Sequence, residues 1–278
     1  MDSTKKGIKE MKLYEDVHRI YKDLAELSYG PGDKLDVDVV SKYDQYHYHG
    51  TEAIDEAIKS LGITEESRVL DVGSGIGGPA RYLAKVTNCQ VMALDLQQDL
   101  NAVAEDLTKR CGLADRVTHK CGDIMVDLPD EMGYDFVVSW LVFLHIPDKA
   151  SLFDVCRKNL KSGGKMFIED FFAKFPFTDD EKDVLAHSVF CRELPTKEQY
   201  EDALKVAGFV NIKYEDVTED WLQFVQGRAN AYMEESSRHA RVYGEVTYMN
   251  QQDFYNNVVD LFKGGHLGGA KIEATRAE

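Results

Sequence analysis

Strand-like stretches alternate with amphipathic ones along the middle of the chain. The amphipathic segments carry apolar residues three and four positions apart, as Ile54, Ala57, Ile58 and Leu61 do. Strands are predicted over residues 68–72, 89–94, 116–121, 136–140 and 165–168. A sustained strand–helix alternation with short connections predicts an α/β fold, in which a parallel sheet is doubly wound by helices on both faces.

Both ends of the chain depart from this alternation. The first 50 residues are polar and aromatic, with one helix predicted near 10–28. Beyond residue 175 the pattern predicts a helix over 196–206, a strand over 211–217, helical stretches over 219–243 and 251–262, and a closing strand over 269–274. We expect an N-terminal lid, residues 1–64, and a main domain, residues 65–278. A helical insertion at about 218–263, called the roof below, is expected to cover the ligand crevice.

A glycine-rich turn follows the first predicted strand in the segment LDVGSGIGG, residues 70–78. Glycines at a strand-to-helix turn let a ligand approach the backbone closely, and this spacing also matches a dinucleotide fingerprint. Asp71 precedes the first glycine, where it would repel a pyrophosphate but hold an ammonium group. Asp95 ends the second strand and suits a ribose, while Asp123 and Ile124 follow the third strand and suit an adenine. The combination indicates S-adenosylmethionine as the ligand.

Over residues 45–175 the chain resembles the class I S-adenosylmethionine-dependent methyltransferases. The resemblance rests on LDVGSGIGGPARYLA, ALDL, the Gly122-Asp123 pair and LKSGGKMFIED. It implies a Rossmann-like seven-stranded sheet whose last strand is antiparallel. It also implies that S-adenosyl-L-methionine is held by Tyr48, His49, Asp71, Gly73, Gly75, Gly77, Asp95, Leu96, Asp123, Ile124 and Trp140.

Three residues are candidates for catalysis. His145 follows the fourth strand and is the candidate base, although it is equally suited to capping the following helix. Asp170 ends the fifth strand, where it would orient an amine or hydroxyl or simply be solvated. Tyr21, together with Tyr14 and Tyr29, is a candidate for the substrate side of the lid. Methyl transfer from an activated donor needs mainly proximity and a dry pocket, so no metal is expected.

The stretch KYDQYHYHG, residues 42–50, contains three tyrosines and two histidines. Histidines two apart on a strand point to one side, so a metal half-site was one hypothesis for His47 and His49. No cysteine or carboxylate partner is evident in the sequence. The resemblance places this stretch over the cofactor, so we expect Tyr46, Tyr48 and His49 to form an aromatic wall.

The acceptor is harder to predict than the cofactor. The chain is similar to phosphoethanolamine and sarcosine/dimethylglycine N-methyltransferases, but Trp140-Leu141 stands where the former carry Arg-Asp, and Phe171 where they carry Tyr. These differences disfavour a phosphobase and favour another small amine. A carbon or oxygen methyltransferase acting on a sterol, quinone or secondary metabolite, or a non-catalytic cofactor-binding subunit, are the alternatives. Four aromatic residues of the roof are candidates for lining the acceptor pocket, but their helical spacing favours core packing for most of them: Trp221, Phe224, Tyr232 and Tyr243.

Charge and cysteine content restrict the partners and the compartment. The 278 residues contain 33 Lys plus Arg and 49 Asp plus Glu, which gives a formal net charge of −16. This charge disfavours binding to nucleic acid or to anionic membranes. There is no secretory signal or membrane-spanning apolar run, and five scattered cysteines form no disulfide or zinc pattern. We expect a cytoplasmic monomer or homodimer that acts on a small molecule.

Overall fold

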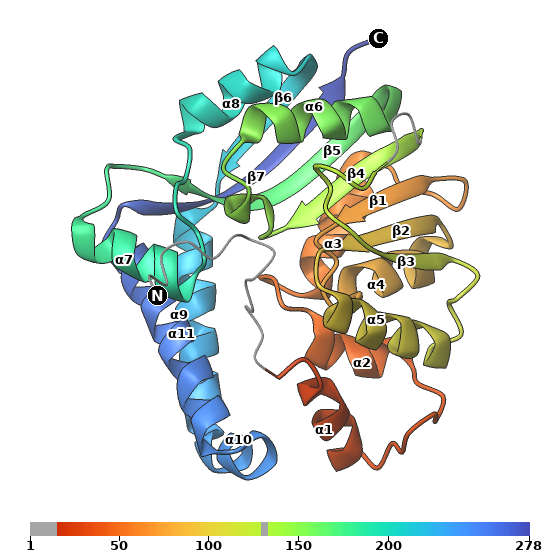
Figure 1. The fold of residues 1–278 in the computed structure, drawn as a ribbon, viewed down its shortest axis with the longest axis vertical. Coiled ribbons are helices and arrows are strands. Elements are labelled where there is room, and N and C mark those ends of the chain that lie inside the picture. Colours follow the sequence, from red (N-terminus) through yellow and green to blue (C-terminus); the bar gives the residue numbers. More distant parts are fainter. Residues whose placement is uncertain (1–15, 129–132) are drawn as a thin grey trace.

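A single seven-stranded sheet forms the centre of the molecule (Figure 1). The computed structural model describes residues 16–128 and 133–278. The strand order is β3-β2-β1-β4-β5-β7-β6, and β7 runs antiparallel to both of its neighbours. The strands are β1 (Arg68–Val72), β2 (Gln90–Asp95), β3 (Val117–Cys121), β4 (Tyr134–Trp140), β5 (Leu160–Ala173), β6 (Phe209–Asp216) and β7 (Leu267–Arg276). The predicted Rossmann-like sheet with an antiparallel last strand is therefore confirmed.

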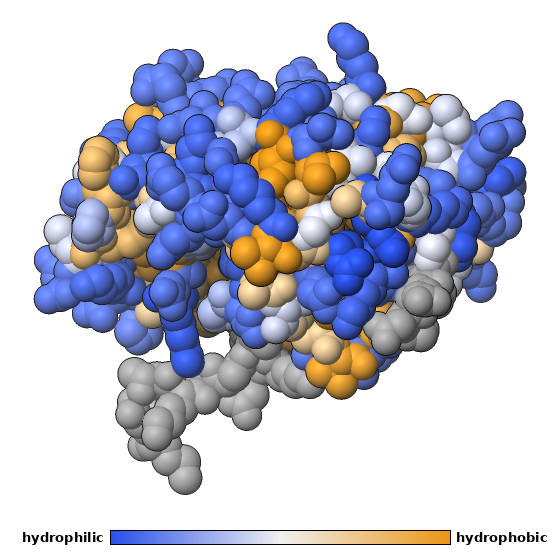
Figure 2. All heavy atoms as spheres, turned by 90° about the horizontal axis from the view of Figure 1, so that it is seen from above, coloured by the Kyte–Doolittle hydropathy of each residue, from blue (hydrophilic) through white to orange (hydrophobic). Residues whose placement is uncertain are grey.

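Helices cover both faces of the sheet, because successive strand residues point to opposite sides. Val69 of β1 packs against α3 and α4, whereas its neighbour Leu70 packs against the cluster that contains α6 and α8. The helices involved are α3 (Thr51–Leu61), α4 (Gly78–Thr87), α6 (Lys149–Asn159) and α8 (Lys197–Val206). Figure 2 looks onto the α6 and α8 side and shows a mostly hydrophilic surface with a few separate hydrophobic groups. Both faces of the sheet are thus buried, as the alternation predicted.

The lid packs along α5 (Gln98–Arg110) at the β3 side of the sheet. Besides α3, which packs on the sheet, its described helices are α1 (Arg19–Glu26) and α2 (Val37–Asp44). Ile20 and Leu24 of α1 and Val40 of α2 bury their side chains against Leu100 and Val103 of α5. The helix predicted near 10–28 is present as α1, its earlier part falls outside the described residues, and α2 was not predicted. The lid boundary at residue 64 stays a prediction.

The roof consists of three helices rather than two. They are α9 (Thr218–Glu234), α10 (Ser236–Tyr243) and α11 (Glu245–Lys263). The stretch predicted as continuous from Glu219 to Tyr243 is interrupted at Glu235, between α9 and α10. Ion pairs connect α10 to α1 of the lid: Arg238 lies 2.7 Å from Asp23 and 3.9 Å from Glu26, and Arg241 lies 2.8 Å from Glu26. The roof therefore packs against the lid, at the lower edge of the molecule in Figure 1.

A buried ion pair joins the lid to the main domain. The Nη2 atom of Arg81 on α4 lies 2.8 Å from Oδ2 of Asp44 at the end of α2, and the two side chains are 0% and 1% exposed. Gly78 lies directly beneath, and a Cβ atom there would approach the backbone oxygen of Asp44 to 2.3 Å. The absence of a side chain at Gly78 is thus what allows α2 to pack this closely on α4.

We expect Arg81→Met to lower the free energy of unfolding by about 3–5 kcal/mol, because Asp44 would remain buried without its partner. Lys85→Met on the same helix is the matched control, since Lys85 pairs with the exposed Asp38 and should contribute less than about 1 kcal/mol. Urea denaturation of both variants measures the difference. Equal losses in the two variants would contradict this account of the interface.

Candidate functional site

A cavity of about 840 Å³ lies at the carboxyl ends of β1 to β4. This volume is within the range of small-molecule sites in proteins. Its lining combines the glycine-rich turn after β1, the residues that follow β2, β3 and β4, the end of α2, and the segment 186–192. The crevice thus lies outside the carboxyl ends of the strands, where the sequence predicted it.

The first two glycines of the turn shape the cavity wall. Gly73 and Gly75 have φ angles of 77° and 54°, in the left-handed region that favours glycine. A Cβ atom on Gly73 would lie 2.3 Å from the side chain of Val142, whereas one on Gly75 would meet nothing within 4 Å. Gly77 does not line the cavity. A Cβ atom on Gly77 would lie 2.7 Å from the His119 side chain and 2.8 Å from that of Arg81. The structure therefore gives Gly77 a packing role, and its contact with a cofactor stays a prediction.

Three carboxylates from three strand ends line this one cavity, as predicted: Asp71, Asp95 and Asp123. Asp71 is 1% exposed, and its Oδ2 atom has no hydrogen-bond partner among the described residues. Burial and the neighbouring charge of Asp95 raise the pKa of Asp71 to about 8. Asp95 accepts hydrogen bonds from the backbone N–H groups of Gly75 and Gln97 at 2.8 and 2.9 Å. Burial raises the pKa of Asp95 as well, and these two bonds oppose the rise.

The apolar partners of these carboxylates are also in place. Leu96, Ile124 and Trp140 all line the cavity, in agreement with their predicted positions. The Nε1 atom of Trp140 has no hydrogen-bond partner among the described residues. The residue opposite it was not predicted: the ring of His47 lies 5.5 Å from the Trp140 ring, and burial lowers the pKa of His47 to about 3.

The aromatic wall of the lid is formed by Tyr46 and His47 rather than by Tyr48 and His49. Tyr48 points instead toward the roof, where its ring packs edge-on against Trp221 at 4.8 Å. The Nε2 atom of His49 lies 2.7 Å from Oδ2 of Asp220 at the start of α9. Tyr48 and His49 thus lie toward the roof, because Phe171 of β5 and Trp221 of α9 bury the Tyr48 ring. Their contact with a cofactor stays a prediction that the cavity lining does not support.

Among the candidate catalytic residues, His145 lines the cavity. It lies on the 3-10 turn η3 (Phe143–His145), which follows β4. Its Nδ1 atom is 3.2 Å from the carbonyl oxygen of Phe190, and because a carbonyl only accepts, Nδ1 carries the proton and Nε2 the lone pair. Burial lowers the pKa of His145 to about 4, so the imidazole is neutral at pH 7.

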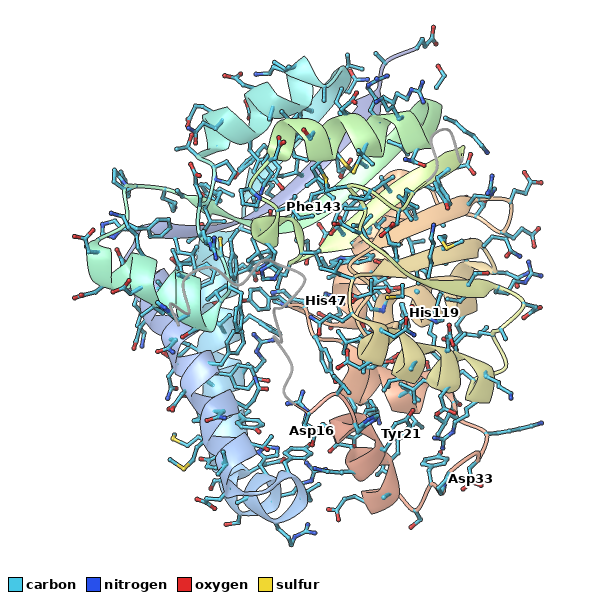
Figure 3. All side chains as sticks on the ribbon, in the orientation of Figure 1. Asp16, Tyr21, Asp33, His47, His119 and Phe143 are labelled. Carbon is cyan, nitrogen blue, oxygen red and sulfur yellow. The ribbon has the colours of Figure 1, made fainter. Side chains whose placement is uncertain are left out.

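Asp170 and Tyr21 do not line the cavity, so a catalytic role for either stays a prediction without support from the cavity lining. Asp170 is fully buried and accepts hydrogen bonds from the Leu144 backbone N–H and the Tyr200 hydroxyl, both at 3.0 Å. Tyr21 donates to Asp106 of α5 at 3.0 Å, and Figure 3 shows it on α1, well apart from His47 and Phe143. Asp170 was a candidate because it ends a strand, and Tyr21 because it is an aromatic residue of the lid. Neither property predicts the contacts that hold these two side chains. Tyr14 lies outside the described residues, and Tyr29 packs against the α1, α2 and α5 cluster.

Another part of the cavity wall is formed by the residues after η3, by α7 (Asp179–Ser188) and by the segment that follows α7. It is lined by Ile146, Pro147, Ala186, His187, Phe190 and Arg192. The roof aromatics Trp221, Phe224, Tyr232 and Tyr243 are absent from the lining, in agreement with the core packing that their helical spacing favours. A local signal for α7 was present in the sequence, because Thr178 and Glu181 form a capping box at its start.

Within residues 16–128 and 133–278, no three His, Cys, Asp or Glu side chains gather in an arrangement that would hold a metal ion. In the same part of the chain, no helix combines the length and the apolar character needed to cross a bilayer.

Comparison with known proteins agrees with this geometry. A family described as "Methyltransferase domain" matches residues 45–214. The chain is 24% identical to the phosphoethanolamine N-methyltransferase of Plasmodium falciparum over 214 residues, which cover 76% of this chain and 79% of that protein. It is 28% identical to the sarcosine/dimethylglycine N-methyltransferase of Halorhodospira halochloris over 204 residues, which cover 73% and 72%.

A solved structure with a similar fold is phosphoethanolamine N-methyltransferase 2 of Haemonchus contortus in complex with S-adenosylhomocysteine and phosphomonomethylethanolamine. Its TM-score is 0.79 at 22% identity, with 84% of this chain and 55% of that chain covered. The chain also spans only about 35–40% of the length of plant phosphoethanolamine N-methyltransferases that it matches. Since the family match covers more than half of the sequence, this chain belongs to the methyltransferase family of that description.

Proposed function

We propose that the protein methylates the nitrogen of a small amine, with S-adenosyl-L-methionine as the donor. The observation that carries the proposal is the shared cavity, in which three buried or half-buried carboxylates face a neutral histidine. The relatives named above methylate phosphoethanolamine, sarcosine and dimethylglycine according to their names, and this supports an amine acceptor. A separate wall at residues 186–192 supports a second, acceptor-binding region in the same cavity.

The residues of the cavity fit this cofactor. The unpartnered Oδ2 of buried Asp71 suits an ammonium group, and Asp95 suits the two ribose hydroxyls. Asp123 and Ile124 would hold the adenine, with Leu96 and Trp140 as apolar contacts. Gly73 and Gly75 leave room for the methionine end, and His47 in place of Tyr48 and His49 would complete the wall on the lid side.

The bound cofactor would supply a methyl group on a sulfonium, which is already activated for displacement. The protein would then align the acceptor and exclude water. The Nε2 lone pair of His145 would accept a hydrogen bond from the amine N–H and so orient the nitrogen lone pair. Ile146, Pro147 and Phe190 would provide the apolar surface around it.

Assembly, compartment and domain organisation are further parts of the proposal. We place the protein in the cytoplasm as a monomer or homodimer, with a lid over residues 1–64. All five cysteines are free thiols, and three of them are buried, which suits a reducing compartment. Gel filtration with light scattering measures the oligomeric state.

Asp71→Asn should abolish cofactor binding and yet stabilise the cofactor-free protein at pH 8. The pKa of Asp71 is about 8 in the folded state and near 4 when unfolded, so ionisation costs stability progressively as pH rises from about 4 to 8. Each unit of raised pKa corresponds to about 1.4 kcal/mol, and an amide removes this cost. Melting temperatures of both proteins at pH 5 and 8 measure it. A variant that melts below the wild type at pH 8 would contradict the assignment.

His145→Ala should lower kcat by about 10²-fold while leaving the Kd of S-adenosylmethionine unchanged, because His145 acts on the acceptor and not on the cofactor. His49→Ala serves as the control, since His49 lies outside the cavity and should retain kcat. Steady-state kinetics and equilibrium titration separate the two effects. If His145→Ala turned over at the wild-type rate, His145 would have no part in the reaction.

Mass spectrometry of products from a panel of amines, sterols and phenols tests the reaction itself. We expect methyl transfer to nitrogen on small amines only. Products methylated only on carbon or oxygen would replace the proposed reaction with one of those classes. Tight cofactor binding without turnover on any acceptor would indicate a non-catalytic subunit.

A further inference from the structure

The turn that carries His145 is held by a buried lysine. Lys149, the first residue of α6, is 7% exposed. Its Nζ atom donates hydrogen bonds to the carbonyl oxygens of Phe143 and Ile146, each at 2.7 Å. These two carbonyls flank His145 in the sequence, so one ammonium group bridges the backbone on both sides of the histidine.

A carboxylate holds the same turn from the opposite direction. Oδ1 of Asp170 on β5 accepts the backbone N–H of Leu144 at 3.0 Å. Its Oδ2 accepts the hydroxyl of Tyr200 from α8 at the same distance. Three backbone groups in and beside this short turn, the carbonyls of Phe143 and Ile146 and the N–H of Leu144, are therefore bonded to side chains of α6 and β5. None of Lys149, Asp170 and Tyr200 lines the cavity.

Burying charged side chains beside a turn costs free energy, and this cost calls for a functional explanation. Burial lowers the pKa of Lys149, and the charge of Asp170 opposes that decrease. A 3-10 turn of three residues has few bonds of its own, so without outside donors its orientation would vary. The imidazole must in addition present Nδ1 to Phe190, whose own φ of 54° is unusual for a residue with a side chain.

We propose that Lys149 is a positioning residue for methyl transfer: by bridging the carbonyls of Phe143 and Ile146 against Asp170, it fixes the turn so that His145 keeps its proton on Nδ1 and its lone pair on Nε2. Lys149 acts through His145 and does not touch the acceptor. The inference rests on the proposed function for its kinetic consequence, but the state of the His145 ring is measurable without any reaction.

The kinetic test compares Lys149→Met and Lys149→Gln with the wild type. Loss of the bridge should lower kcat by about 10²-fold in the Met variant, as expected for a displaced catalytic group. The KM and Kd for S-adenosylmethionine should not change, because the protein carboxylates that are proposed to bind the cofactor follow other strands. The Gln variant keeps an N–H donor and should recover part of kcat.

A stability control separates positioning from general loosening of α6. Asp148→Ala removes the N-cap of the same helix, whose side chain accepts the Ser151 N–H at 3.0 Å, without touching the turn. It should lower the melting temperature and leave kcat unchanged. A loss of kcat in Asp148→Ala as large as that in Lys149→Met would overturn the proposal.

The spectroscopic test uses the cofactor-free protein and needs no acceptor. Nitrogen-15 NMR of the His145 ring should show a protonated Nδ1 in the wild type and a mixture of tautomers in Lys149→Met. If Lys149→Met does not fold, the same comparison is made with Lys149→Gln. An unchanged ring spectrum together with unchanged kcat would overturn the inference. If the wild type methylates no amine while the ring spectrum changes as expected, the proposed function fails and the positioning role stands.

Discussion

The buried ion pair between Arg81 and Asp44 is the interaction on which the shape of the site depends. It fixes the end of α2 on α4, and thereby places the following residues, Tyr46 and His47, on the cavity wall. The second half of the glycine-rich turn serves this contact, since Gly77 and Gly78 allow the close approach of Arg81, His119 and Asp44. One sequence motif therefore has two tasks: its first glycines shape the cavity and its last ones dock the lid.

The cavity holds its carboxylates at a cost in stability. Asp71 and Asp95 lie close enough for each charge to disfavour the other, and both are buried. A cofactor that brings a positive charge relieves this repulsion. The free energy that the repulsion costs in the empty site is therefore recovered when the cofactor binds. Perturbed carboxyl groups of this kind are typical of functional sites rather than of ordinary cores.

The features that were predictable from sequence are local ones. All seven strands and the glycine-rich turn follow from short patterns, and the carboxyl ends of parallel strands bring Asp71, Asp95 and Asp123 together. What the sequence could not predict is the direction of side chains that pack against residues far away in the chain. Asp170 is used by Leu144 and Tyr200, and the Tyr48 ring enters the cluster with Trp221.

Proton release on cofactor binding tests the central claim most directly. In the free protein Asp71 has a pKa of about 8 and is mostly protonated at pH 7, whereas an ammonium group beside it favours the ionised form. Calorimetric titration with S-adenosylmethionine at pH 7, in two buffers of different ionisation enthalpy, counts the protons exchanged. The account predicts release of close to one proton per cofactor, which Asp71→Asn cannot show. Binding without proton release, or no binding at all, would contradict it.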